Sequence, residues 1–116
     1  MQAMELPGKS TRGIMPEFVA TYDLEETAPS PHTEFKRIAS DHDWHGMVID
    51  SRDSSMKFLP NSTVSLTADT MRAAVSSFGV LVSDAKRNIP NFHIERVTIV
   101  GGGEVCAFHD GDPIRY

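Results

Sequence analysis

Apolar and polar residues alternate along the segment that begins at Glu17, and this pattern predicts a β-strand. Phe18, Ala20, Tyr22 and Leu24 fall on one face of an extended chain, and the residues between them fall on the other. The stretches FHIERVTIV and EVCAFHDG near the end of the chain are also β-rich, and the three glycines between them predict a hairpin turn.

Two other segments follow the helical period. The first stripe comprises Phe35, Ile38, Ala39 and His42, and the second comprises Met71, Ala74, Val75, Phe78, Leu81, Val82 and Ala85. We expect Ser30 to be the N-cap of the first helix and Gly46 to end it. For the second helix we expect Thr67 as the cap, with Asn88 and Pro90 at the end.

Two extended segments, MVIDSR and MKFLPNSTVSL, lie between the helices. Pro60 cannot donate to a ladder, so the second is either an edge strand or is broken at Pro60 and Asn61. The element order is therefore β-α-β-β-α-β with one added C-terminal strand. That order predicts an α+β, ferredoxin-like fold, with two helices on one face of an antiparallel sheet. Because the other face would be open to water, we expect a homodimer.

Composition sets the class of protein. The 116 residues are 40% apolar, which suits one domain, expected over residues 15–116; residues 1–14 show neither period and are expected to form a flexible tail. The apolar runs are far shorter than the roughly 18 residues that span a bilayer, and no leader pattern opens the chain. The single cysteine excludes an internal disulfide or a thiolate zinc site. We expect a cytoplasmic protein without membrane contact.

The stretch SDHDWHG, residues 40–46, brings together two histidines and two aspartates. Residues three apart on a helix are neighbours, so His42 and His45 have a spacing that can bind metal. The second histidine, however, follows the expected end of the helix. We interpret the stretch as a helix terminus with Trp44 anchoring the next strand.

Asp23 is the best candidate for chemistry. It closes the first predicted strand, and Glu25 and Glu26 follow, so hard oxygen ligands for Mg²⁺ or Mn²⁺ gather at one end of the sheet. In a twofold dimer two copies of Asp23 could share an ion that activates water for phosphodiester attack. The alternative is a solvated acidic loop after a strand.

Several of these residues also carry a family resemblance. The sequence MPEFVATYDLEE (residues 15–26), the pair Asp43 and Trp44 before a strand, and FLPNSTV (residues 58–64) resemble small ferredoxin-like proteins. These are grouped with the GhoS-type endoribonuclease antitoxins, the VapD type and the CRISPR-associated adaptation nucleases. The resemblance implies a dimer that cleaves RNA or DNA. It also implies that Asp23 is both catalytic residue and metal ligand, because it matches the aspartate that ends the first strand of the CRISPR-associated members.

Three hypotheses of function follow. The first is a dimeric nucleic-acid-associated or toxin-antitoxin-like protein, acting as a metal-dependent endoribonuclease. Since the net charge of -5 repels phosphate, it needs local basic residues to bind nucleic acid or a partner. The candidates are Lys36, Arg37, Arg52 and Lys57. The second is a non-enzymatic protein-interaction module, and the third is a small-molecule site lined by His42, His45 or His93.

Overall fold

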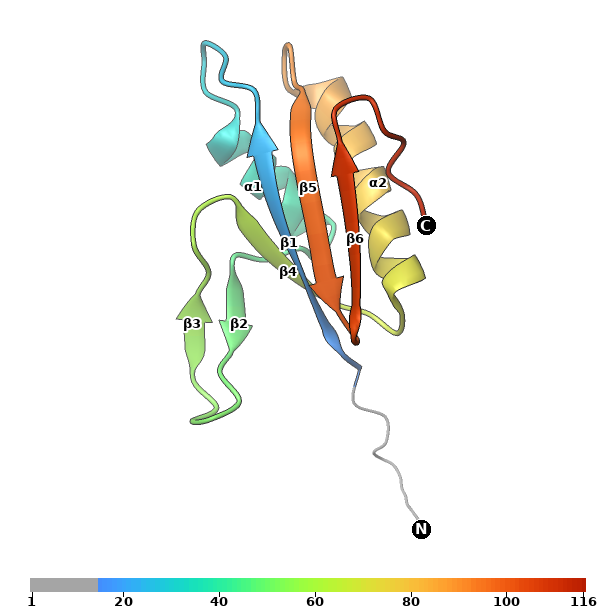
Figure 1. Cartoon of the computed structure of the whole chain (residues 1–116). Coiled ribbons are helices and arrows are strands. Elements are labelled where there is room, and N and C mark those ends of the chain that lie inside the picture. Colours follow the sequence, from blue (N-terminus) through green and yellow to red (C-terminus); the bar gives the residue numbers. More distant parts are fainter. Residues whose placement is uncertain (1–14) are drawn as a thin grey trace.

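Helices and strands follow one another closely in residues 15–116, the part of the chain that the computed structural model describes (Figure 1). In chain order they are β1 (Glu17–Leu24), α1 (His32–Asp41), β2 (Met47–Ile49), β3 (Met56–Phe58), β4 (Thr63–Thr67), α2 (Met71–Asn88), β5 (Ile94–Gly101) and β6 (Glu104–His109). The tail expected over residues 1–14 lies outside the described residues. The α+β class is confirmed.

A four-stranded antiparallel sheet in the order β4-β1-β5-β6 forms the centre of the fold. β1 shows the predicted alternation, since Phe18, Ala20, Tyr22 and Leu24 are buried and the residues between them are not. Ala20 is paired with Val64 on β4 and with Ile99 on β5. Because paired residues of neighbouring strands point to the same side, one face of the sheet is apolar across three strands.

Both helices cover this apolar face, and they lie behind the sheet in the view of Figure 1. The buried residues of α2 are the seven that the helical period predicts. Aromatic rings fill the space between helices and sheet: the Phe35 ring lies 4.9 Å from that of Tyr22, and the Trp44 ring lies 5.3 Å from that of Phe78. The helices and the covered face of the sheet therefore share one core.

The ends of α1 differ from the prediction. Pro31, not Ser30, is the N-cap, and no side chain caps the first turn. The helix ends at Asp41, before Gly46, because the chain turns there in a Schellman motif. In it the Trp44 N–H donates to the Ala39 carbonyl at 2.9 Å, and Asp43 takes a positive φ of 65°. Aspartate tolerates this left-handed conformation better than most residues, so it replaces the glycine we expected.

The start of α2 was also predicted wrongly. Thr67 is the last residue of β4, where it pairs with Glu17, so it cannot begin the helix. Thr70 is the N-cap instead, and its Oγ1 accepts a hydrogen bond from the Ala73 N–H at 3.1 Å. The predicted end holds, since α2 stops at Asn88, two residues before Pro90.

The two middle segments do not extend the central sheet as expected. β2 and β3 pair with each other in a separate two-stranded antiparallel ribbon. The second segment is broken at Pro60 and Asn61, and only its later part, β4, joins the sheet. An isolated bridge between His45 and Ser65 connects the ribbon to the edge of β4. The central sheet thus gains its fourth strand from β6.

The three glycines form the predicted hairpin turn between β5 and β6. Gly101, with a φ of 156°, lies directly against β1, where an added Cβ would come within 2.5 Å of Phe18 Cδ1 and 2.6 Å of the Glu17 carbonyl oxygen. Only glycine fits there without displacing β1, so the run sets how closely the hairpin approaches its neighbour.

Candidate functional site

The face of the sheet opposite the helices is open, and its side chains form rows across the strands. Val19 on β1 pairs with Val100 on β5, and Val100 pairs with Val105 on β6. Three valines from adjacent strands therefore stand side by side. Val100 is 40% exposed and Val105 is 67% exposed. A contiguous apolar row on a solvent-facing sheet is typical of an interaction surface.

Farther along the strands the open face becomes polar and then charged. The next row consists of Thr21, Thr98 and Ala107. The row after it begins with Asp23, which pairs with Arg96 across the ladder. Arg96 Nε donates a hydrogen bond to Asp23 Oδ2 at 3.1 Å. The terminal nitrogen Nη2 of Arg96 lies 3.0 Å from the same oxygen. The open face is therefore graded from apolar at one end to ionic at the other.

The ribbon made of β2 and β3 carries a second apolar surface. Met47 pairs with Phe58, and Ile49 pairs with Met56, so these four side chains share one face of the ribbon. Phe58 is 86% exposed, the largest fraction among the exposed large hydrophobic residues that the structure describes. Two strands of three residues each cannot bury such side chains between themselves. This face of the ribbon is therefore exposed to solvent in the single chain.

Ser65 on β4 fixes the ribbon beside the sheet. Its N–H donates to the His45 carbonyl at 2.7 Å, and its hydroxyl donates to the Met47 carbonyl at 2.8 Å. A hollow of about 580 Å³ lies between ribbon and sheet, with Met47 and Ile49 among its lining on one side and Thr67 on the other. Residues of the apolar face of the ribbon therefore border the same hollow as the edge of the sheet.

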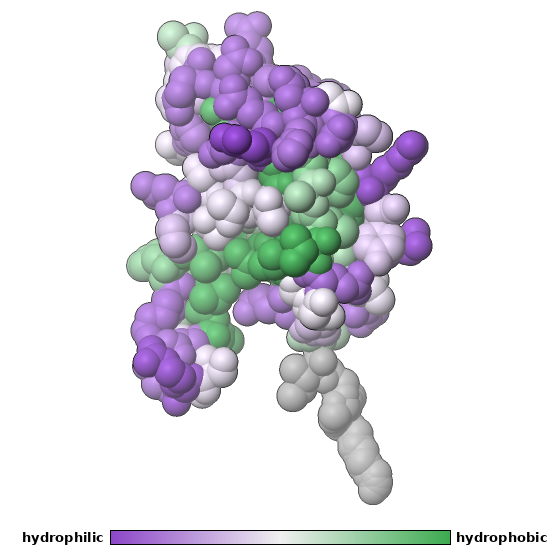
Figure 2. Space-filling view, in the orientation of Figure 1, coloured by the Kyte–Doolittle hydropathy of each residue, from purple (hydrophilic) through white to green (hydrophobic). Residues whose placement is uncertain are grey.

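Together these residues make a continuous surface, which we call the apolar belt. It consists of Val19, Val100 and Val105 on the sheet and Met47, Ile49, Met56 and Phe58 on the ribbon. Figure 2 shows hydrophobic surface running from the ribbon toward the middle of the sheet, with hydrophilic surface above and below it. The belt combines large exposed apolar side chains with a polar border, as interaction sites do.

Asp23 lies at the ionic end of the open face, with Arg96 as its partner. Glu26, which we expected to add a metal ligand, has its carboxylate 2.6 Å from His32 Nε2. Across residues 15–116, no three His, Cys, Asp or Glu side chains come together as a group that could hold a metal ion. To bind Mg²⁺ or Mn²⁺, Asp23 would have to exchange its guanidinium partner for the ion.

The four basic candidates lie in two separate places. They are Lys36 and Arg37 on α1, and, on the ribbon, Arg52 in the turn and Lys57 in β3. Arg37 lies 2.6 Å from Glu34, while Arg52 and Lys57 lie 2.8 and 2.9 Å from Asp50. Hydrogen bonds from Arg52 and Lys57 hold the pKa of Asp50 well below its usual range. These carboxylates offset the positive charge of three of the four candidates, and only Lys36 has no ion pair within residues 15–116.

The residues of SDHDWHG make three separate structural contacts. His42 Nε2 lies 2.9 Å from Asp84 Oδ2 and joins α1 to α2; this hydrogen bond lowers the pKa of Asp84. The indole N–H of the buried Trp44 donates to Ser77 Oγ at 3.1 Å. The backbone of His45 forms the bridge to β4. The interpretation as a helix terminus is confirmed.

Sequence reasoning missed two features of this site. It did not pair Asp23 with Arg96, because the pairing depends on the register between β1 and β5. It also assigned the ribbon strands to the main sheet. Part of the signal for an apolar ribbon was present, since Met56 and Phe58 alternate with the polar Lys57, whereas residues 47–49 are apolar throughout.

Comparisons of the chain with family models, with curated proteins and with solved structures found no match. None of the helices in the described part of the chain is both long enough and apolar enough to cross a membrane. The functional interpretation therefore depends on the geometry of the open face and the ribbon.

Proposed function

We propose that this protein is a non-enzymatic interaction module that pairs with a second copy of itself through the apolar belt. The observation that supports this is the row of Val19, Val100 and Val105, which continues into the exposed face of the ribbon. Removing apolar area from water contributes about 25 cal/mol per Å², so covering this belt favours association.

A second copy suits this surface for two reasons. The belt is apolar both on the sheet and on the ribbon, so two belts related by a twofold axis match each other. The ionic row contains both a carboxylate, Asp23, and a guanidinium, Arg96. An antiparallel arrangement of two copies can therefore place opposite charges near each other at the border of the interface.

We further propose that the fold is a variant of the ferredoxin-like arrangement. β1, α1, β4, α2 and β5 follow its element order, and the segment around His45, bridged to Ser65, takes the place of the second sheet strand. In this interpretation the ribbon is an insertion that follows that segment in the chain, and β6 is an additional edge strand that widens the open face.

Sedimentation equilibrium tests the pairing. We expect the wild type to show twice the 12.8 kDa chain mass and the variant Val105→Lys to be a monomer, because the lysine would bury a charge in the belt. Val80→Lys is the matched control, since Val80 is 57% exposed but lies on α2. A wild type that is monomeric at high concentration, or a Val105→Lys variant that still dimerises, would contradict the proposal.

Endoribonuclease activity is a second proposal. Its support is the resemblance at Asp23 together with the position of Asp23 on the open face, where an incoming chain would meet it. The test is cleavage of labelled single-stranded RNA and duplex DNA with Mg²⁺, Mn²⁺ or EDTA. Asp69→Ala is the control for Asp23→Ala, because Asp69 is exposed and forms no ion pair among residues 15–116. Metal-dependent cleavage that is lost only in Asp23→Ala would support the nuclease. An absence of cleavage would contradict the nuclease proposal and leave the interaction module as the remaining one.

A further inference from the structure

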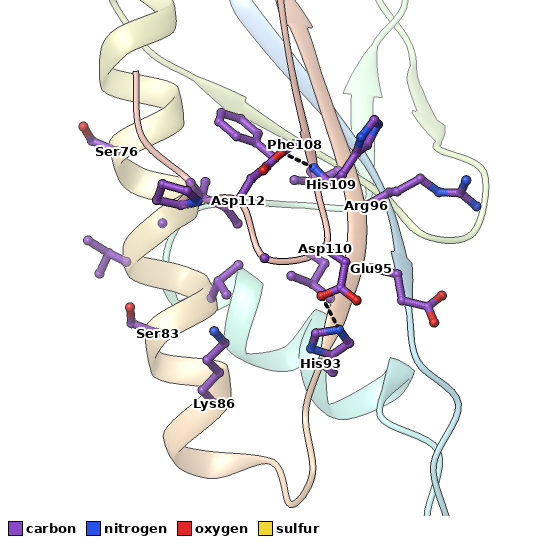
Figure 3. Close-up of a pocket in the computed structure, with 18 of the residues that line it drawn as sticks. Ser76, Ser83, Lys86, His93, Glu95, Arg96, Phe108, His109, Asp110 and Asp112 are labelled. Carbon is purple, nitrogen blue, oxygen red and sulfur yellow. Dashed lines mark hydrogen bonds and ion pairs between the residues drawn. The ribbon is translucent and has the colours of Figure 1, made fainter.

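A groove of about 800 Å³ lies on the other side of the molecule from the ribbon, between α2, the start of β5 and the end of β6 (Figure 3). Its volume is within the range of small-molecule sites. The apolar part of its lining includes Val82, Val97, Phe108 and Ile114. Val82 and Val97 belong to the core, so the floor of the groove is held rigidly by the fold.

The segment that follows β6 forms one wall of the groove, and it is fixed at both ends. At one end Asp112 Oδ2 accepts a hydrogen bond from the His109 N–H at 2.9 Å. At the other end the Tyr116 hydroxyl lies 2.6 Å from Glu104 Oε1, and the Arg72 guanidinium lies 4.7 Å from the Tyr116 ring. The groove is therefore a preformed feature of the fold.

Gly79 explains how this wall comes so close to α2. A Cβ at this position would lie 2.9 Å from the Ile114 carbonyl oxygen. Glycine inside a helix costs about 1 kcal/mol relative to alanine. The close approach of the wall is the feature of the structure that requires this destabilising residue.

Among the charged side chains that line the groove, Lys86, Glu95 and Asp112 form no ion pair within residues 15–116, and of these three only Lys86 is a cation. His93 Nε2 lies 2.7 Å from Asp110 Oδ1, and the neighbouring Arg87 is bound to Asp84 at 3.1 Å. In Figure 3, Lys86 lies at the same end of the groove as the His93 and Asp110 pair, whereas Glu95 extends away from α2.

We propose that this groove binds a small organic carboxylate with an apolar body, distinct from any partner of the apolar belt. The apolar body packs on Val82, Val97 and Phe108. The carboxylate pairs with the Lys86 ammonium, because the two arginines of the lining, Arg87 and Arg96, are already paired with Asp84 and Asp23. His93, held by Asp110, stands beside the carboxylate and defines the end of the groove.

Titration with 4-phenylbutyrate and with its neutral amide, followed by amide-detected NMR and calorimetry, tests this site. We expect saturable shifts at Lys86, His93, Asp110 and Ile114, and affinity at least about tenfold weaker for the amide, because the amide lacks the charge that Lys86 pairs with. Lys86→Gln should weaken carboxylate binding by a similar factor.

Two variants decide between this site and others. Lys36→Gln is the matched control, since Lys36 on α1 also forms no ion pair in the described part of the chain and lies outside the groove. It should leave binding unchanged. Gly79→Ala should weaken binding of the carboxylate and the amide alike, because it displaces the wall that Ile114 forms. No saturable binding at about 10 mM, shifts confined to the apolar belt, or unchanged binding in Lys86→Gln would each overturn the proposal.

Discussion

The two faces of the central sheet are built from the same strands and differ in burial. On the covered face Ala20, Val97 and Ile99 are each at most 2% exposed and pack against the helices. On the open face Val100 and Val105 are 40% and 67% exposed. Since side chains alternate between faces along a strand, one sequence supplies a core on one side and an exposed, partly apolar surface on the other. We therefore expect mutations to separate stability from association.

The largest effect is expected at the centre of the covered face. Phe78→Ala removes a ring that packs against Trp44 and Phe35, at centroid distances of 5.3 and 6.4 Å. The cavity should lower the free energy of unfolding by about 3 to 5 kcal/mol. Urea unfolding measures it.

The control for this prediction is a truncation on the open face. Val105→Ala, measured at a dilution where the chain is monomeric, should change the free energy of unfolding by no more than about 0.5 kcal/mol. Similar losses in Phe78→Ala and Val105→Ala would mean that the open face also belongs to the core, and the contrast between the faces would fail.

The second effect concerns the turn between β5 and β6, where Gly101 lies against β1. Gly101→Ala would place a Cβ 2.6 Å from the backbone oxygen of Glu17, which cannot move without disturbing β1. We expect a loss of about 2 to 3 kcal/mol in thermal or urea unfolding. Gly103 is the matched control: it has a φ of 78°, but a Cβ there would meet open space. Gly103→Ala should therefore cost only about 1 to 2 kcal/mol, and equal losses at the two positions would argue against the steric explanation.

The third effect arises from a polar atom inside the covered face. Tyr22 is 2% exposed, and its hydroxyl has no hydrogen-bond partner among the described residues. Burial raises the pKa of Tyr22 to about 12. Because an unpaired buried hydroxyl destabilises the fold, we expect Tyr22→Phe to raise the free energy of unfolding at neutral pH by about 1 kcal/mol.

The same tyrosine predicts a dependence on alkaline pH. Its folded pKa lies above the unfolded value near 10, so the wild type keeps its full stability below about pH 10 and loses stability as pH rises toward 12. The loss amounts to about 2 to 3 kcal/mol. The free energy of unfolding of Tyr22→Phe should not show this loss between those pH values. Parallel losses in both proteins would assign the alkaline transition to other groups.

The covered face is also the part that the sequence predicted best. Periods of two and 3.6 identified the buried residues of β1 and α2, because core burial imposes those periods directly. The caps were harder, since Thr67 and Thr70 are both suitable residues and only the extent of β4 decides between them. The ribbon was assigned to the wrong sheet, because alternation marks a strand without naming the strand that it pairs with.

The open face was predictable only in part for a related reason. Asp23 was visible as a carboxylate at the end of a strand, but its partner Arg96 lies 73 residues away in the chain. The groove between α2, β5 and β6 depends on contacts of the last residues of the chain with α2, such as the contact of Ile114 with Gly79. No local pattern marks such long-range contacts, so sites assembled from distant segments need the structure.

The smallest effect is expected at the contact between the two helices, away from the open face. The hydrogen bond from His42 lowers the pKa of Asp84, so the ionised carboxylate stabilises the folded state. A lowered folded pKa means that this stability is present above the unfolded value near 4 and is lost as pH falls through the folded pKa. Asp84→Asn should therefore lower the melting temperature at neutral pH, and this difference should close in acid.

Asp69→Asn is the control for this last prediction, because Asp69 is exposed and has no ion pair in the part of the chain that the structure describes. It should leave the melting temperature unchanged at both pH values. Asp84 lies on the helix layer, so Asp84→Asn should also leave the sedimentation behaviour of the chain unchanged. A variant that loses both stability and association would show that the helix contact and the apolar belt are coupled, and that the two faces of the sheet are not independent.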